Sequence, residues 1–137
     1  MSSCVIADTL ELTYRPDLDI LVGRWTQQPT PDLLPLLYQQ LAETAVEHGA
    51  LYWLQDIRRR SFNDPATTTW LLTTYFPATA RRLGGRLHVA YLASPALLHH
   101  ILTSPGYLPP DAYAAEPFSV AFFSDEGPAA EWLNQQR

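Results

Sequence analysis

Apolar and polar residues alternate near the start of the chain. Leu10, Leu12 and Tyr14 share one side of this segment, while its other side is polar, and this alternation predicts a half-buried strand. A turn over residues 15–19 joins it to a second β-rich run, residues 20–25. Because the connection is short, the two strands are expected to form an antiparallel hairpin.

A helical pattern follows the hairpin. Thr30-Pro31-Asp32 is expected to open a helix with Asp32 as the N-cap, which would place Pro35 in the first turn, where its missing N–H costs little. Gly49 supplies the stop after His48 in the last turn. The apolar stripe of this helix consists of Leu34, Leu37, Tyr38, Leu41 and Ala45.

The rest of the chain alternates between strand and helix. Residues 51–57, 86–92 and 118–123 are predicted strands, and the first is almost continuously apolar, which is typical of a strand buried on both faces. A capped helix is expected after each of them. The cap signals are Asn63-Asp64-Pro65, Ser94-Pro95 (for a helix through Leu102) and Ser124-Asp125, with Pro128 in the first turn of the last helix.

Proline interrupts the helix that begins at Pro65. Pro77 follows Phe76 and is expected to kink or break the helix, with a short piece resuming to Leu83 and ending at Gly84-Gly85. The whole order is β-β-α-β-α-β-α-β-α, in which strands separated by helices imply parallel pairing and right-handed crossovers. The sequence therefore predicts a single α/β domain over residues 1–137, with a mixed, mostly parallel five-stranded sheet, an antiparallel N-terminal hairpin and about four covering helices.

Composition narrows the classes of function. The net charge is −5 and all nine basic residues are arginine, so non-specific nucleic-acid binding and lysine-based chemistry are not expected. Cys4 is the only cysteine, which excludes an internal disulfide and a thiolate metal cluster. Residues 1–10 have no signal-peptide pattern and no run is long enough for a membrane span. We expect a cytoplasmic protein, monomeric or homodimeric, without metal, nucleotide or redox cofactor.

The order of elements, together with two segments, resembles the STAS domain in its SpoIIAA-like or STAS/SEC14-like branch. One segment is Trp53-Leu54-Gln55-Asp56 entering a loop and a capped helix, and the other runs from Phe122-Phe123-Ser124-Asp125-Glu126 to Trp132-Leu133. The likeness covers nearly the whole chain and implies a non-enzymatic regulatory or binding domain. The partners it implies are proteins or small, sometimes lipid-like, ligands.

The loop after the third predicted strand departs from that family. Anti-sigma antagonists carry an Asp-Ser-Ser-Gly type motif there, with a phosphorylatable serine. This chain reads Arg58-Arg59-Arg60-Ser61-Phe62-Asn63-Asp64-Pro65, so only Ser61 is a candidate equivalent and the following glycine is absent. A phosphate on Ser61 would be stabilised by the neighbouring arginines.

The same loop is the leading candidate binding surface, for a protein partner or an anionic ligand. It follows the carboxyl end of a central strand, where α/β sheets place ligands, and its arginines have forked donors suited to anions. Consecutive arginines cannot all point one way, so at most two are expected to converge. The alternative is that they pair with nearby carboxylates. The predicted site consists of Asp56, Arg58, Arg59, Arg60, Ser61, Asn63 and Asp64.

An apolar groove is the second binding hypothesis. The interruption at Phe76-Pro77 would leave a groove beside the helix, and the loop from Tyr107 to Tyr113 could cover it. Trp70, Phe76 and Tyr107 are its predicted lining, and its ligand would be a small apolar or lipid-like molecule.

Catalysis is not expected. Asp56 and His88, with Ser61 or Ser94, are the candidate members of a hydrolase triad, but the Gly-x-Ser-x-Gly pattern is absent. The adjacent residues His99-His100 would face apart on a helix, and His48 is expected near a helix end at the surface. A second basic cluster of Arg81, Arg82 and Arg86 is interpreted as favourable to a helix C-terminus, with a partner surface as the alternative.

Overall fold

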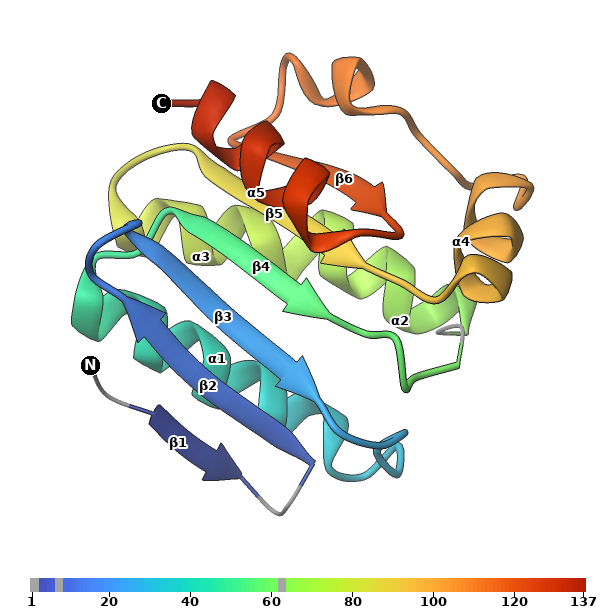
Figure 1. Ribbon diagram of the computed structural model, residues 1–137, viewed down its shortest axis with the longest axis horizontal. Helices are drawn as coiled ribbons and strands as arrows, with labels where there is room; N and C mark the ends of the chain where they lie inside the picture. Colours follow the sequence, from blue (N-terminus) through green and yellow to red (C-terminus); the bar gives the residue numbers. More distant parts are fainter. Residues whose placement is uncertain (1–2, 7–8, 62–63) are drawn as a thin grey trace.

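The computed structural model describes residues 3–6, 9–61 and 64–137, which form one six-stranded sheet with the strands in sequence order (Figure 1). The first three strands pair antiparallel, and all later neighbours pair parallel. The strands are β1 (Ser3–Ile6), β2 (Leu10–Arg15), β3 (Ile20–Trp25), β4 (Tyr52–Asp56), β5 (Leu87–Leu92) and β6 (Phe118–Phe123).

The predicted α/β class is confirmed, with the hairpin formed by β2 and β3 and the remaining predicted strands parallel. The structure adds one strand, β1, which pairs with β2 from Ser3 opposite Thr13 to Ile6 opposite Leu10. This strand has four residues, too few for an alternating pattern to reveal it. Backbone pairing with the exposed edge of β2 is what creates it.

Helices cover the two faces of the sheet unequally (Figure 1). The three crossovers between parallel strands bring their helices to one face. This is required when every crossover is right-handed and each new strand is added on the same side of the previous one. Among the helices of the described residues, only α5 packs on the opposite face, against β4, β5 and β6. The helical segments are α1 (Leu34–His48), α2 (Pro65–Trp70), the π-helical η1 (Leu71–Tyr75), α3 (Phe76–Leu83), α4 (Pro95–Leu102), the 3-10 turn η2 (Pro110–Tyr113) and α5 (Glu126–Gln135).

The larger part of the core lies on the face with three crossovers. Trp53, the second residue of β4, is fully buried there, and its indole N–H donates to the Ala50 carbonyl at 2.9 Å. Phe76 and Phe118 pack beside it with ring centroids 5.4 Å apart. The face under α5 has a smaller core around Leu54, Leu92 and Leu133. Burial on both faces explains why β4 and β5 are almost continuously apolar.

Several helix boundaries agree with the local signals. Asp64 caps α2 by accepting the Thr67 N–H at 2.6 Å, and Ser94 caps α4 by accepting the Leu97 N–H at 3.2 Å. The predicted N-cap Asp32 is wrong, because α1 begins at Leu34 with Leu33 in the cap position and no side-chain cap. Hydrogen-bonded turns from Thr30 and Pro31 occupy the preceding residues, and the helix starts one residue later than predicted.

Pro77 does not break its helix. Segments α2, η1 and α3 follow one another without a gap, and the residues before the proline form a π-helical turn. In this turn the Phe76 N–H donates to the Leu71 carbonyl, five residues back. The wider turn accommodates a proline that has no N–H and whose ring would crowd the carbonyl four residues earlier. The interruption predicted at Phe76-Pro77 is therefore a local widening of a continuous helix.

Replacing either of two glycines by alanine is expected to change the free energy of unfolding, with opposite signs at the two positions. Gly84 ends α3 with a φ of 74°, whereas Gly127 lies in the first turn of α5, and a Cβ at either position would meet open space. We expect Gly84→Ala to lower the free energy of unfolding by about 1 kcal/mol because of the left-handed backbone. Gly127→Ala should raise it by up to about 1 kcal/mol. Urea unfolding of both variants checks this, and equal effects would contradict it.

Candidate functional site

A cavity of about 490 Å³ lies at the carboxyl end of the parallel strands, on the face with three crossovers. This is where open α/β sheets place their ligands, and the volume is in the range of small-molecule sites. Its lining is mainly apolar and aromatic. The residues are Ile57, Arg60, Ser61, Pro65, Thr68, Thr69, Leu71, Leu72, Phe76, Tyr91, Leu97, Ile101, Ser104, Pro105, Gly106, Tyr107, Leu108, Tyr113, Val120 and Phe122.

The sheet supplies the floor of the cavity. Tyr91 lies on β5, and Val120 and Phe122 lie on the neighbouring strand β6. The Tyr91 and Phe122 rings stack with centroids 5.2 Å apart and an angle of 13° between planes. Strand residues two apart point to the same face, so Val120 and Phe122 both face the cavity. Packed rings on a rigid sheet make this floor preorganised.

Two helical walls rise from this floor. The π-helical turn contributes Leu71 and Leu72, and α4 contributes Leu97 and Ile101, which are four residues apart and so share one helix face. Helix α4 follows β5 closely and lies at the carboxyl end of the sheet instead of flat over its centre (Figure 1). The cavity occupies the space between these two walls.

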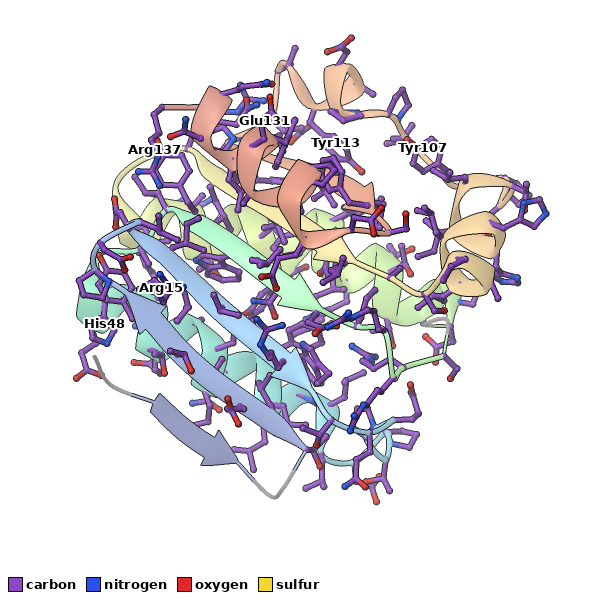
Figure 2. All side chains as sticks on the ribbon, viewed as in Figure 1. Arg15, His48, Tyr107, Tyr113, Glu131 and Arg137 are labelled. Carbon is purple, nitrogen blue, oxygen red and sulfur yellow. The ribbon has the colours of Figure 1, made fainter. Side chains whose placement is uncertain are left out.

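The segment between α4 and β6 closes the remaining side. Tyr107 and Tyr113 line the cavity from this segment, with Tyr107 on the side toward α4 and Tyr113 farther from that helix (Figure 2). The Tyr107 ring is 6.2 Å from Phe122, and the Tyr113 ring is 5.5 Å from Phe118. Burial raises the pKa of Tyr113 to about 12, so its phenol is neutral at ordinary pH.

The loop that begins at Asp56 divides between the two faces of the sheet. Asp56 lies on the α5 face, where its carboxylate accepts hydrogen bonds from Arg58 Nη2 at 2.8 Å and from Arg24 Nη1 at 2.9 Å. Arg24 also pairs with Glu126, at 3.0 Å. Burial alone would raise the pKa of Asp56, but the bonds from Arg58 and Arg24 outweigh it and hold that pKa below its usual range.

The next residues of the loop turn to the other face. Ile57, Arg60 and Ser61 line the cavity. The Arg60 guanidinium is buried, with its central carbon 4.6 Å from the centroid of the Trp25 ring and Nη1 donating to the Tyr38 hydroxyl at 3.2 Å. The two predicted binding surfaces, the arginine loop and the apolar groove, therefore meet in one cavity.

The predicted loop residues do not all converge. Arg58 is engaged by Asp56, Arg59 is exposed outside the cavity, and Asp64 is engaged as the α2 cap. Asn63 lies outside the described residues. The three arginines thus take three directions, and both interpretations of the loop apply to part of it: Arg58 pairs with a carboxylate, whereas Arg60 lies at the site.

Two of the three predicted groove residues, Phe76 and Tyr107, line the cavity. Trp70 does not, which corrects its predicted place. Its ring packs on Tyr38 of α1, with centroids 5.8 Å apart, and on Tyr75, at 5.2 Å. The reason is geometric: Trp70 directly precedes the π-helical segment and lies on the side of the helix that faces α1.

Sequence reasoning did not single out several lining residues. Tyr91 looked like any residue of a buried strand, and Leu97 and Ile101 looked like the ordinary core stripe of a helix. The available signal was the four-residue spacing of Leu97 and Ile101 on a helix that starts shortly after a strand. That signal does not distinguish a wall of a cavity from a contact in the core.

The candidate hydrolase residues are not brought together. His88 lies opposite Tyr52 at the amino end of β4, whereas Asp56 lies at its carboxyl end. His88 Nδ1 is 2.8 Å from the Ser119 hydroxyl on the α5 face, and the ring stacks on Tyr52 at 5.5 Å. Ser94 caps α4. Chemistry that needs these side chains within hydrogen-bond reach is not supported by this arrangement.

The remaining candidates are dispersed. Arg82 pairs with Glu43 at 2.9 Å, and Arg86 donates to the Tyr113 carbonyl at 2.8 Å, so the second basic cluster is spread over different neighbours. His48 stacks on Tyr14 with centroids 4.5 Å apart, near the end of α1 (Figure 2). The pair His99-His100 is exposed on α4.

Within residues 3–6, 9–61 and 64–137, histidine, cysteine and carboxylate side chains form no group of three or more that could hold a metal ion. Over the same ranges, no helix has the length and apolar character needed to cross a membrane. No protein-family model matches the chain, and a comparison with curated proteins found no match.

His88 makes stability depend on pH. Burial, with a smaller effect from Arg86, lowers the pKa of His88 to about 4, against about 6.5 for an unfolded histidine. Between these values the unfolded state binds the extra proton, so the free energy of unfolding falls as the pH drops. We expect His88→Asn to remove up to about 2 kcal/mol of the loss seen between pH 7.5 and pH 4.5.

Urea unfolding at the two pH values measures this difference, and His99→Asn, which changes an exposed histidine, is the matched control. A His88→Asn variant with the same pH dependence as the wild type would contradict the assignment.

Proposed function

We propose that this protein binds a small, largely apolar molecule in the cavity between η1 and α4. The observation that carries the proposal is the cavity of about 490 Å³, whose walls are mainly aliphatic and aromatic side chains from six separate segments of the chain. Exposed Leu108 at its side adds apolar surface that a ligand would cover. An apolar ligand would gain about 25 cal/mol for each Å² of apolar surface it removes from water.

The construction of the walls supports a binding role. The π-helical turn widens the helix where it lines the cavity, and such turns occur often at functional sites although they satisfy backbone bonding less well than an α-helix. Tyr107 and Leu108 lie on a segment that has no regular structure between α4 and η2, so it is the element best able to admit a ligand.

A binding role fits the chemistry of the lining better than catalysis does. The polar groups at the cavity are hydroxyls and one guanidinium, and both Asp56 and His88 lie on the other face of the sheet. We also propose that the chain is STAS-like, as its resemblance to that family suggests. The parallel strands in sequence order and the helix after the loop at Asp56 support this classification.

A cavity-filling variant tests the proposal. Leu72→Trp places an indole in the cavity from a half-buried position, so we expect it to weaken binding of the neutral fluorescent probe N-phenyl-1-naphthylamine at least tenfold. Leu83→Trp is the matched control, because Leu83 is a half-buried leucine of the same continuous helix outside the cavity. Fluorescence titration gives the affinities. Similar affinity in both variants and the wild type would place the probe elsewhere and contradict the proposal.

A second candidate function is a regulatory partner surface on the outer side of the loop. Arg59 and Ser61 are both exposed, and the Ser61 N–H donates to the Gln28 side chain at 2.8 Å, which holds the serine at the surface. Native mass spectrometry of gently purified protein should then show a phosphate that fragmentation assigns to Ser61, or a co-purifying chain. A bare monomer or homodimer would count against a stable partner and against this switch.

A further inference from the structure

Most of the strong polar groups in the cavity lining are engaged by the protein itself. Nη1 of Arg60 donates to the hydroxyl of Tyr38, which lies in the core and outside the lining. The Tyr91 side chain also hydrogen-bonds to Tyr38, and Ser104 Oγ donates to the His100 carbonyl at 2.7 Å. Among the described residues, no carboxylate or histidine side chain lines the cavity. This lining is therefore suited to a ligand without a charge.

The Tyr113 side chain is the exception. It lines the cavity and is 5% exposed, but its hydroxyl makes no hydrogen bond within the described part of the chain. The hydroxyl is also absent from the fully enclosed, unpaired side-chain atoms of that part, so it borders accessible space. A ligand that fills this space displaces the water there, and it then has to supply the hydrogen bond that the hydroxyl lacks.

The position of Tyr113 is fixed by contacts that leave its hydroxyl unused. The ring packs on Phe118 with centroids 5.5 Å apart, and the backbone carbonyl accepts from Arg86 at 2.8 Å. Burial, and then the nearby phenol of Tyr107, raises the pKa of Tyr113 to about 12. Tyr107 lies on the same segment and also lines the cavity (Figure 2). The Tyr113 hydroxyl is thus a preorganised, neutral hydrogen-bond donor at the wall that this segment forms.

We propose that the ligand is an uncharged, largely apolar molecule with a carbonyl group, and that the Tyr113 hydroxyl donates a hydrogen bond to this carbonyl. This inference rests on the proposed binding function and names the chemical class of its ligand. A carbonyl oxygen is a strong acceptor with no proton of its own, which suits a phenol donor. A site with a buried donor also discriminates against an analogue that lacks the acceptor, because the donor then stays unpaired.

Three ligands of one shape separate the carbonyl from apolar fit and from charge. 2-Acetylnaphthalene, 2-isopropenylnaphthalene and 2-naphthoate have the same flat ring system and carry a ketone, an alkene and a carboxylate of similar size. Isothermal titration of the wild type should give the ketone an affinity about fivefold higher than that of the alkene, as one net hydrogen bond provides. The carboxylate should bind weakest, because its charge would lose water without gaining a counterion.

The outcomes separate this inference from the proposed function. Equal affinity for the ketone and the alkene, or no binding of the ketone where the neutral dye binds, would overturn the carbonyl inference and leave the apolar cavity standing. Tightest binding of 2-naphthoate would overturn the inference that the ligand is uncharged. No binding of any of the three, together with no binding of the dye, would overturn the proposed function itself.

Single-hydroxyl substitutions assign the preference to a residue. Tyr113→Phe removes only the donor, so the preference for the ketone should disappear while the alkene binds as before. Tyr52→Phe is the matched control, because Tyr52 is a half-buried tyrosine outside the cavity, and this variant should keep the preference. A preference that survives Tyr113→Phe, or that is lost in Tyr107→Phe alone, would overturn the role of Tyr113.

Urea unfolding without ligand tests whether the Tyr113 hydroxyl is free for a ligand. Tyr113→Phe keeps the ring contact with Phe118 and the backbone carbonyl that accepts from Arg86. The free energy of unfolding should therefore stay the same or rise, because the lost hydroxyl has no partner among the described residues. A clear decrease, or failure of this variant to fold, would show that the protein itself uses the hydroxyl and would reject the inference.

Discussion

Four parallel strands added in sequence order, β3 to β6, constrain the whole molecule. Every right-handed crossover in a sheet that grows in one direction brings its helix to the same face. That face therefore holds α1, the helix from α2 to α3, and α4, whereas the other is left to the terminal helix α5. The larger core and the cavity both lie on the first face because several helices pack side by side there.

The cavity is a product of how that face is filled. The continuous helix widens at Leu71–Tyr75 ahead of Pro77, and α4 has eight residues and lies at the carboxyl end of the sheet. The segment after α4 then has to return to β6, and it closes the space with Tyr107 and Tyr113 on the way. Two features together leave space that core side chains do not fill. One is the proline that constrains the first helix, and the other is the shortness of the second helix.

Tyr38 joins the core to the cavity. From α1 its carbonyl accepts the Tyr75 hydroxyl and its own hydroxyl accepts from Arg60. Its ring packs against those of Trp25 and Trp70. On the other face Asp56 holds Arg24 and Arg58. The pleat of β4 explains this division, because consecutive residues at the end of a strand leave toward opposite faces.

The sequence by itself determined features that depend on neighbours in the chain. It determined the alternation of strands and helices, the caps at Asp64 and Ser94, and the glycine stop at Gly49, because periodicity and capping are local. The sequence also predicted that Phe76 and Tyr107 lie at a groove, because Pro77 follows Phe76 and a proline-containing loop holds Tyr107. Tertiary structure alone decided that β1 pairs at the edge and that Trp70 turns to α1. It also decided that Arg60, and neither arginine before it, enters the cavity, since these depend on which distant surfaces meet.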